Sequence, residues 1–138
     1  MKLRTFMIAV KRKLLIFLDS LRDKDYLKTV SAKELGFDES KYYRYSTSAN
    51  TYLVKVLNDI NIKNKDSIID IGSGKGSVIK FFLQFPFEKV GGLEVSKELI
   101  SISKKNLKHV SQKKLVHFNE NAKDFDKYDD FNIYYLYN

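Results

Sequence analysis

Residues 67–76 read Ser67-Ile68-Ile69-Asp70-Ile71-Gly72-Ser73-Gly74-Lys75-Gly76, so that a short apolar run passes directly into a glycine-rich turn. The run predicts a short buried strand, and three glycines at alternate positions let the backbone turn sharply. Because glycine has no Cβ, such a turn also leaves room for a ligand to approach the main chain closely. In an open parallel sheet, ligands bind beyond the carboxyl ends of the strands. We therefore predict a ligand site at residues 70–76, and a nucleotide-like ligand suits it.

The residues that follow alternate between helix and strand patterns, with glycine, proline and polar turns between them. We expect a helix over 77–85, a strand over 89–95, a helix from 96 to about 109, a strand over 115–118 and a strand over 131–137. Strands that alternate with helices imply right-handed crossovers and a parallel sheet. The predicted fold class is α/β, a Rossmann-like parallel sheet of about four strands with flanking helices.

Helical patterns also occur before the glycine turn. Steps of three and four residues predict one apolar stripe on a leading helix, formed by Leu3, Met7, Val10, Leu14, Phe17 and Leu21. Such a stripe has to be covered by the rest of the protein or by a second copy, and a basic amphipathic helix on a membrane is the alternative. Short helical pieces and a loop are expected over 22–46. Ser46-Thr47-Ser48 is typical of an N-cap region, for a helix through about residue 60 with Leu53, Val56, Leu57 and Ile60 on one face.

Length and composition are those of a globular protein. The 138 residues are 43% hydrophobic, enough for one domain with a real core. The predicted organisation is an N-terminal helical extension over residues 1–46 and a Rossmann-like domain over residues 47–138. The lack of cysteine excludes disulfides and thiolate zinc sites, and His109 and His117 do not have the spacing of metal ligands. We therefore expect no metal.

The formal net charge of +8 is concentrated in the leading part of the chain. Residues 1–66 carry 14 Lys and Arg against 8 Asp and Glu, whereas residues 67–138 carry 11 against 9. Nucleic acid or an anionic membrane could bind such a segment, although a Lys-rich and Asn-rich composition is also typical of an AT-rich genome. No stretch approaches the roughly 20 apolar residues that cross a bilayer, and the apolar run at the start is too short for a signal peptide. We expect a cytoplasmic protein.

Two other glycine motifs do not match this turn. A P-loop needs Ser or Thr directly after Gly-Lys, where this chain has Gly76, and a leading glycine where it has Ile69. The dinucleotide fingerprint needs glycine or alanine where this chain has Ser77. A P-loop phosphate site and an NAD site are therefore disfavoured.

What remains is the pattern Asp-x-Gly-x-Gly-x-Gly, with Glu94 ending the second strand 24 residues after Asp70. It resembles motif I and the following acidic position of class I methyltransferases that depend on S-adenosylmethionine (SAM). The resemblance implies that the turn passes under the methionine part of SAM and that Glu94 accepts hydrogen bonds from both ribose hydroxyls. An ionised carboxylate suits that role because it offers two acceptor oxygens. The implied contacts from the turn come from Asp70, Gly72, Ser73, Gly74 and Gly76.

The resemblance extends beyond the motif, to a subgroup of small bacterial methyltransferases of unassigned substrate. The run over 86–99 and the ending Tyr135-Leu136-Tyr137-Asn138 are similar to that subgroup. In such enzymes the residue after the acid, here Val95, packs on adenine. Asn121-Ala122 corresponds to the pair that contacts the adenine amino edge.

Two further implied site segments lie at the ends of this region. Tyr45 and Ser48 correspond to residues of a Tyr-x-Pro-Thr stretch over the methionine end of SAM, although Thr47 stands in place of the proline. Asn138 falls where superfamily members that act on amines hold the nucleophile in line with the methyl group. The resemblance therefore makes Asn138 the candidate catalytic residue, acting by positioning.

Taken together, the resemblance implies a SAM-dependent methyltransferase that transfers a methyl group to an unidentified acceptor. Class I methyltransferases close their sheet with seven strands, and four are predicted here, so we expect a truncated protein whose fourth strand is an exposed edge. Such an edge invites pairing, which predicts a homodimer through this strand or through the N-terminal helix. Two alternatives stay open, namely a SAM-binding module or inactive fragment without turnover, and a basic N-terminal helix that binds nucleic acid or membrane.

Overall fold

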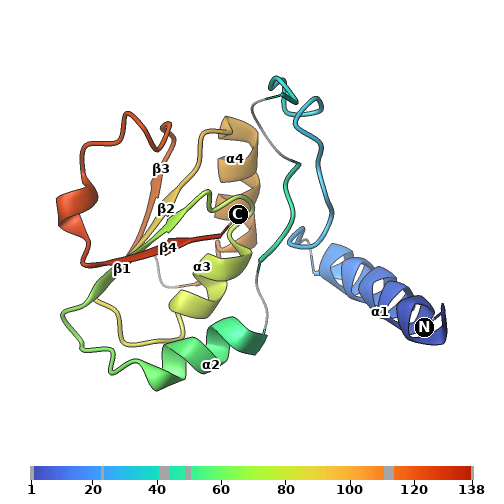
Figure 1. Cartoon of the computed structure of the whole chain (residues 1–138), viewed down its shortest axis with the longest axis horizontal. Coiled ribbons are helices and arrows are strands. Elements are labelled where there is room, and N and C mark those ends of the chain that lie inside the picture. The colour runs from blue at the N-terminus through green and yellow to red at the C-terminus, as the bar shows by residue number, and fades with distance from the viewer. Residues whose placement is uncertain (1, 23, 41–43, 49–50, 111–113, 138) are drawn as a thin grey trace. The chain divides into compact units, whose positions relative to one another are not determined.

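A four-stranded parallel sheet with helices packed against it organises the C-terminal part of the protein (Figure 1). The computed structural model describes residues 2–22, 24–40, 44–48, 51–110 and 114–137. The chain divides into two compact units, residues 1–46 and residues 47–138. Its elements, in chain order, are α1 (Lys2–Leu21), α2 (Thr51–Asp59), β1 (Ser67–Ile71), α3 (Ser77–Phe82), β2 (Lys89–Leu93), α4 (Lys97–Asn106), β3 (Leu115–Phe118), the 3-10 helix η2 (Tyr128–Asp130) and β4 (Ile133–Leu136).

The strand order is β3-β2-β1-β4, and each neighbouring pair is parallel. β1 therefore lies between β2 and β4, with Ile69 opposite Gly91 on one side and Tyr134 on the other. This sheet and its helices confirm the predicted α/β, Rossmann-like fold. Because all four strands run in one direction, their carboxyl ends share one edge, and the turn after β1 meets the loop after β2 there.

The two faces of the sheet are covered by different parts of the chain. Strand side chains alternate between faces, so Ile68 and Ile69 of β1 belong to separate buried clusters. The larger cluster joins α2, α3 and the end of α4 to the sheet through Leu53, Leu57, Ile68, Val78, Ile79, Phe82, Phe87, Val90, Leu107 and Leu115. The smaller cluster lies where the segment between β3 and β4 covers the other face, and consists of Ile69, Leu93, Phe125 and Phe131.

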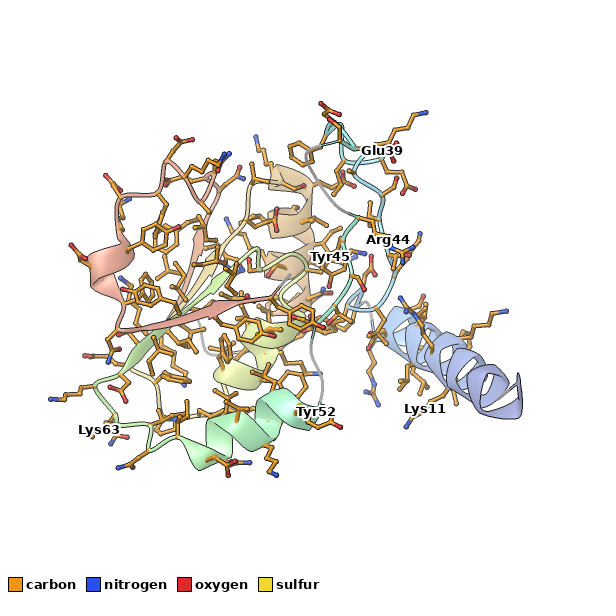
Figure 2. The ribbon with its side chains drawn as sticks, in the orientation of Figure 1. Lys11, Glu39, Arg44, Tyr45, Tyr52 and Lys63 are labelled. Atoms are coloured by element: carbon orange, nitrogen blue, oxygen red, sulfur yellow. The ribbon has the colours of Figure 1, made fainter. Side chains whose placement is uncertain are left out.

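Helix α2 is only half covered by this packing. Leu53 and Leu57 are buried, whereas Val56 is 55% exposed and Ile60 is 42% exposed, so only part of the predicted apolar face is covered. Tyr52 projects from the start of the helix and is 79% exposed (Figure 2). The exposed residues adjoin β4, which among the described residues pairs only with β1. The exposed side of α2 therefore lies next to the edge strand of the sheet.

Several predicted elements are longer than those observed. α3 ends at Phe82 rather than at residue 85, β2 ends at Leu93 rather than at residue 95, and β4 covers only the middle of 131–137. Helix α4 is shorter as well, although Ser96 caps it by accepting a hydrogen bond from the Leu99 amide at 3.2 Å. The ends differ because residues at the ends of the predicted elements form turns, bends or caps instead of continuing the helix or strand.

The N-terminal unit contains α1, which confirms the predicted leading helix. Its apolar stripe is not covered where side chains are described, because Leu14, Phe17 and Leu21 are 55%, 58% and 68% exposed. Between Arg22 and Ser46, the described residues form turns in place of the expected helical pieces. Within the described ranges, no helix is long and apolar enough to cross a membrane. The other members of the stripe, whose side chains lie outside the described part, are Leu3, Met7 and Val10.

Candidate functional site

The glycine turn after β1 has the left-handed backbone that its sequence requires. Gly72 has φ +80° and Gly76 has φ +78°, conformations that residues with a Cβ rarely adopt. A Cβ on Gly72 would meet nothing within 4 Å, so this side of the turn is open to a ligand. A Cβ on Gly76 would stand 2.3 Å from the Ser103 hydroxyl oxygen, so that side is closed by α4. Gly72 therefore leaves room for a ligand to approach the turn, whereas Gly76 allows α4 to pack closely against it.

Backbone amides of the turn are directed into the protein. The amides of Gly72 and Ser73 both donate to the Leu93 carbonyl, at 2.8 and 3.0 Å. The Gly74 amide donates to a side-chain oxygen of Glu94 at 3.0 Å. A phosphate cradle needs such amides to converge on the anion instead. The geometry therefore agrees with the rejection of a P-loop.

Glu94 lies directly after β2 and faces the turn. It is 8% exposed, its Oε2 accepts from the Gly74 amide at 3.0 Å, and its Oε1 accepts from the Ser96 amide at 2.9 Å. A carboxylate has about four acceptor positions, so each oxygen retains the capacity to accept one more hydrogen bond. The arrangement can therefore hold two hydroxyl groups of a ligand at this edge.

Asp70 is buried near the end of β1, opposite Gly92 and Tyr135 on the neighbouring strands. Burial, with a smaller contribution from the charge of Glu94, raises the pKa of the Asp70 carboxyl to about 8 from its usual 3.8. The side chain is then largely protonated at neutral pH. A cationic ligand group near the two acids would favour their charged forms.

The Ser73 hydroxyl is buried and has no hydrogen-bond partner among the described residues. A Cβ on Gly92 would stand 3.0 Å from it, so the hydroxyl lies on the β2 side of the turn. Unpaired buried polar atoms are rare in folded proteins and often mark a ligand or water site. The open side of Gly72, the spare acceptors of Glu94 and this hydroxyl together fit a polar ligand at the turn.

The predicted adenine contacts follow β2 and β3. Val95 is half-buried and comes directly after Glu94. The side-chain oxygen of Asn121 accepts from the Lys123 amide at 3.0 Å, so it forms a local turn. The Ala122 carbonyl accepts from the Tyr128 hydroxyl at 2.7 Å. Contact of these residues with adenine stays a prediction.

Ser48 lies at β4, where its hydroxyl accepts a hydrogen bond from the Tyr135 hydroxyl at 3.2 Å. The neighbouring Thr47 hydroxyl bonds the hydroxyl of Ser77, the first residue of α3, at 2.5 Å. Residues 49–50, which precede α2, lie outside the described part of the structure, so the N-cap expected at residues 46–48 stays a prediction. Contact of Ser48 with the methionine end of SAM stays a prediction.

Tyr45 and Asn138 are the two remaining predicted site residues. The Tyr45 hydroxyl donates to the Tyr26 carbonyl at 2.9 Å, within the N-terminal unit. Asn138 lies outside the described residues. The SAM contact of Tyr45 and the positioning role of Asn138 stay predictions.

Two asparagines that the sequence analysis did not select contact the loops of the site. The Asn119 amide nitrogen donates to the carbonyls of Glu94 and Val95, at 3.0 and 2.9 Å. The Asn106 amide nitrogen donates to the Lys75 carbonyl at 3.0 Å, and Asn106 is 2% exposed. A polar residue within the apolar stripe of α4 was a signal for Asn106, whereas no local pattern indicated Asn119.

His117 lies beneath the turn. Its Nε2 is 2.9 Å from the Ser103 hydroxyl, and burial, followed by the charge of Lys104, lowers its pKa to about 4. The imidazole is therefore neutral at physiological pH. Within the described part of the chain, no three His, Cys, Asp or Glu side chains are grouped so that they could hold a metal ion.

Comparisons with known proteins identify a family and similar solved structures. The family model of histone methylation protein DOT1 matches residues 24–132 of the 138. An RNA methyltransferase from Salinibacter ruber, solved with S-adenosyl-L-homocysteine, is 19% identical; the match covers 59% of this chain and 54% of that one, with a TM-score of 0.50. A dimethyladenosine transferase from Plasmodium falciparum is 22% identical over 56% of this chain and 28% of that one, with a TM-score of 0.48. This chain thus spans about half or less of the length of these structures, and the Salinibacter match supports the fold.

Proposed function

This chain belongs to the DOT1 family, a group of class I SAM-dependent methyltransferases, and from that premise we propose that it binds SAM at the carboxyl edge of its sheet. The observation that carries the proposal is the Glu94 carboxylate, buried and turned toward the glycine turn, with acceptor capacity left on both oxygens. The open side of Gly72 supports it, because the main chain can approach a ligand there without a side chain between them.

In this proposal, different residues bind the nucleoside part and the methionine part of SAM. Glu94 accepts hydrogen bonds from the ribose hydroxyls, and Val95 and Asn121-Ala122 contact the adenine. The glycine turn holds the methionine part, and Ser48 is a further contact to it. Ser48 is held by its hydrogen bond with Tyr135, and the neighbouring Thr47 by its hydrogen bond with Ser77. The turn residues are Asp70, Gly72, Ser73, Gly74 and Gly76. Tyr45 is proposed as a further contact to the methionine carboxylate.

The reaction proposed is methyl transfer to an acceptor nucleophile. SAM, when bound, supplies a methyl group that is already activated by its attachment to a positively charged sulfur. The protein then contributes orientation rather than a covalent intermediate, and orientation alone can lower a barrier by roughly 7–11 kcal/mol. Asn138 is proposed to hold the acceptor in line, and the carboxylate of Glu94 provides negative charge that favours a cationic ligand.

A direct test uses equilibrium dialysis of the chain against radiolabelled SAM, followed by incubation with cell extract. Saturable binding that S-adenosylhomocysteine displaces is expected, together with transfer of label to an extract component and release of S-adenosylhomocysteine. Binding without transfer would favour the alternative, a SAM-binding module without turnover. Absence of binding would overturn the proposal.

A homodimer through β4 is proposed as the oligomeric state. Tyr134, Leu136 and Tyr137 are 50%, 72% and 64% exposed along this strand, and an open edge of this kind pairs readily with another strand. The exposed side chains of α1 offer a second route to the same state. An apolar groove adjoins β4 and is lined by residues that include Val56 of α2 and Ile60, which directly follows that helix.

A further inference from the structure

Hydrogen bonds between β2 and β3 continue past the end of the strands through a side chain. The Glu94 amide donates to the Phe118 carbonyl at 3.0 Å, which is the last backbone bond between the two elements in this direction. At the next position, the Asn119 side chain supplies the donor. Its Nδ2 donates to the Glu94 carbonyl at 3.0 Å and to the Val95 carbonyl at 2.9 Å.

As a consequence, the backbone of Glu94 is held on both sides. Its amide is fixed by Phe118 and its carbonyl by Asn119. The direction in which its side chain leaves the main chain is then set, and the carboxylate reaches the amides of Gly74 and Ser96. Because the Val95 carbonyl is bound as well, the peptide that orients the Val95 side chain is held by the same amide group.

We infer that Asn119 is a positioning residue for the nucleoside half of SAM, acting through Glu94 and Val95. The inference rests on the proposed function, because it assigns those two residues to the ribose and the adenine. Asn119 and Asn121 differ in this respect, because the side-chain oxygen of Asn121 accepts a hydrogen bond from the nearby Lys123 amide. Asn119 is exposed, so its two hydrogen bonds matter more for the shape of the loop than for the core.

The first measurement is the affinity of Asn119→Ala for S-adenosylhomocysteine, by calorimetry on the full chain. Because the substitution removes both hydrogen bonds that hold the backbone of Glu94 and Val95, we expect the dissociation constant to rise about ten-fold. Asn119→Asp keeps the shape but its carboxylate cannot donate to a carbonyl, so its affinity should fall at least as far. Unchanged affinity in both variants would overturn the inference.

Asn132 offers a matched control. It is also exposed and also makes two side-chain hydrogen bonds, accepting from the Ser67 amide at 2.7 Å and donating to Asp66 at 2.9 Å, at the opposite end of β1. Asn132→Ala should lower the melting temperature about as much as Asn119→Ala and leave the affinity unchanged. An equal loss of affinity in the control would mean that general destabilisation explains both results, and would overturn the positioning role.

A second readout needs no ligand. In 1H–15N spectra, the amide signals of Gly74 and Ser96 should move in Asn119→Ala, because the Glu94 carboxylate that accepts from them is no longer held. They should stay in place in Asn132→Ala, and unmoved signals in both variants would contradict the inference. If the unaltered chain binds no S-adenosylhomocysteine but these signals move, the proposed function fails while the control of Glu94 by Asn119 stands.

Discussion

The Glu94 carboxylate accepts a hydrogen bond from the Gly74 amide at 3.0 Å across 20 residues of sequence. The acid after β2 and the turn after β1 are therefore parts of one site, although each is formed locally. Because these two residues meet at the shared carboxyl edge of parallel strands, changes at either one should be detectable in ligand binding.

Glu94→Ala should raise the dissociation constant for S-adenosylhomocysteine at least ten-fold. Hydrogen bonds to a charged group contribute about 1.5–3 kcal/mol, and the substitution removes both acceptor oxygens. Glu94→Gln, which keeps one acceptor oxygen, should bind with intermediate affinity. Calorimetry measures both, with Glu98→Ala on the exposed side of α4 as the control. Full affinity in Glu94→Ala would contradict the proposed ribose contact.

Asp70→Asn should make the protein more stable, and more so at pH 8 than at pH 5. The pKa of Asp70 is about 8 in the folded protein against a usual 3.8, so the folded state holds this proton more tightly than the unfolded chain. The contribution of Asp70 to stability is then fully present below pH 3.8 and is lost as the pH rises towards 8. Urea denaturation at both pH values measures the difference, with the exposed Asp129→Asn as the control. A gain that is equal at the two pH values would contradict the raised pKa.

Gly76→Ala should lower the free energy of unfolding by about 1–3 kcal/mol. Its φ of +78° is strained for alanine, and the new Cβ would stand 2.3 Å from the Ser103 hydroxyl oxygen. Gly36→Ala is the control, because φ there is +75° but nothing lies within 4 Å of the added Cβ. Chemical denaturation should show the larger loss for Gly76→Ala, and Ser103→Ala in the same chain should restore part of it. An equal loss of stability in the two variants would mean that the contact of the new Cβ with Ser103 of α4 does not contribute.

Leu136→Lys should shift a β4-linked dimer to monomer. Leu136 is 72% exposed on the edge strand, and a charge there opposes pairing with another copy. Sedimentation at several protein concentrations measures the equilibrium, and Leu14→Lys on α1 tests the other proposed route. A monomer at every concentration in the unaltered chain would rule out both routes.

Much of the site could be predicted because its parts are local. The strand over residues 67–71 and the glycine turn that follows it depend on residues within a few positions of each other. The cap at Ser96 is equally local, although it was not predicted. The approach of Glu94 to the turn could be expected as well, since parallel strands bring their carboxyl ends to one edge.

The sequence by itself thus determined the parallel α/β fold and the acid and glycines at the carboxyl ends of its strands. Alternating strands and helices, and glycine turns, can each be recognised from short stretches of sequence. Only the tertiary structure decided that Asn119 holds the Glu94 backbone, that the Ser48 hydroxyl binds Tyr135, and that Val56 faces outward. These features join residues 25 or 87 positions apart, or depend on which strand lies at the edge of the sheet. A local sequence pattern does not predict such pairs, because the residues meet only when separate helices, strands and loops pack against one another.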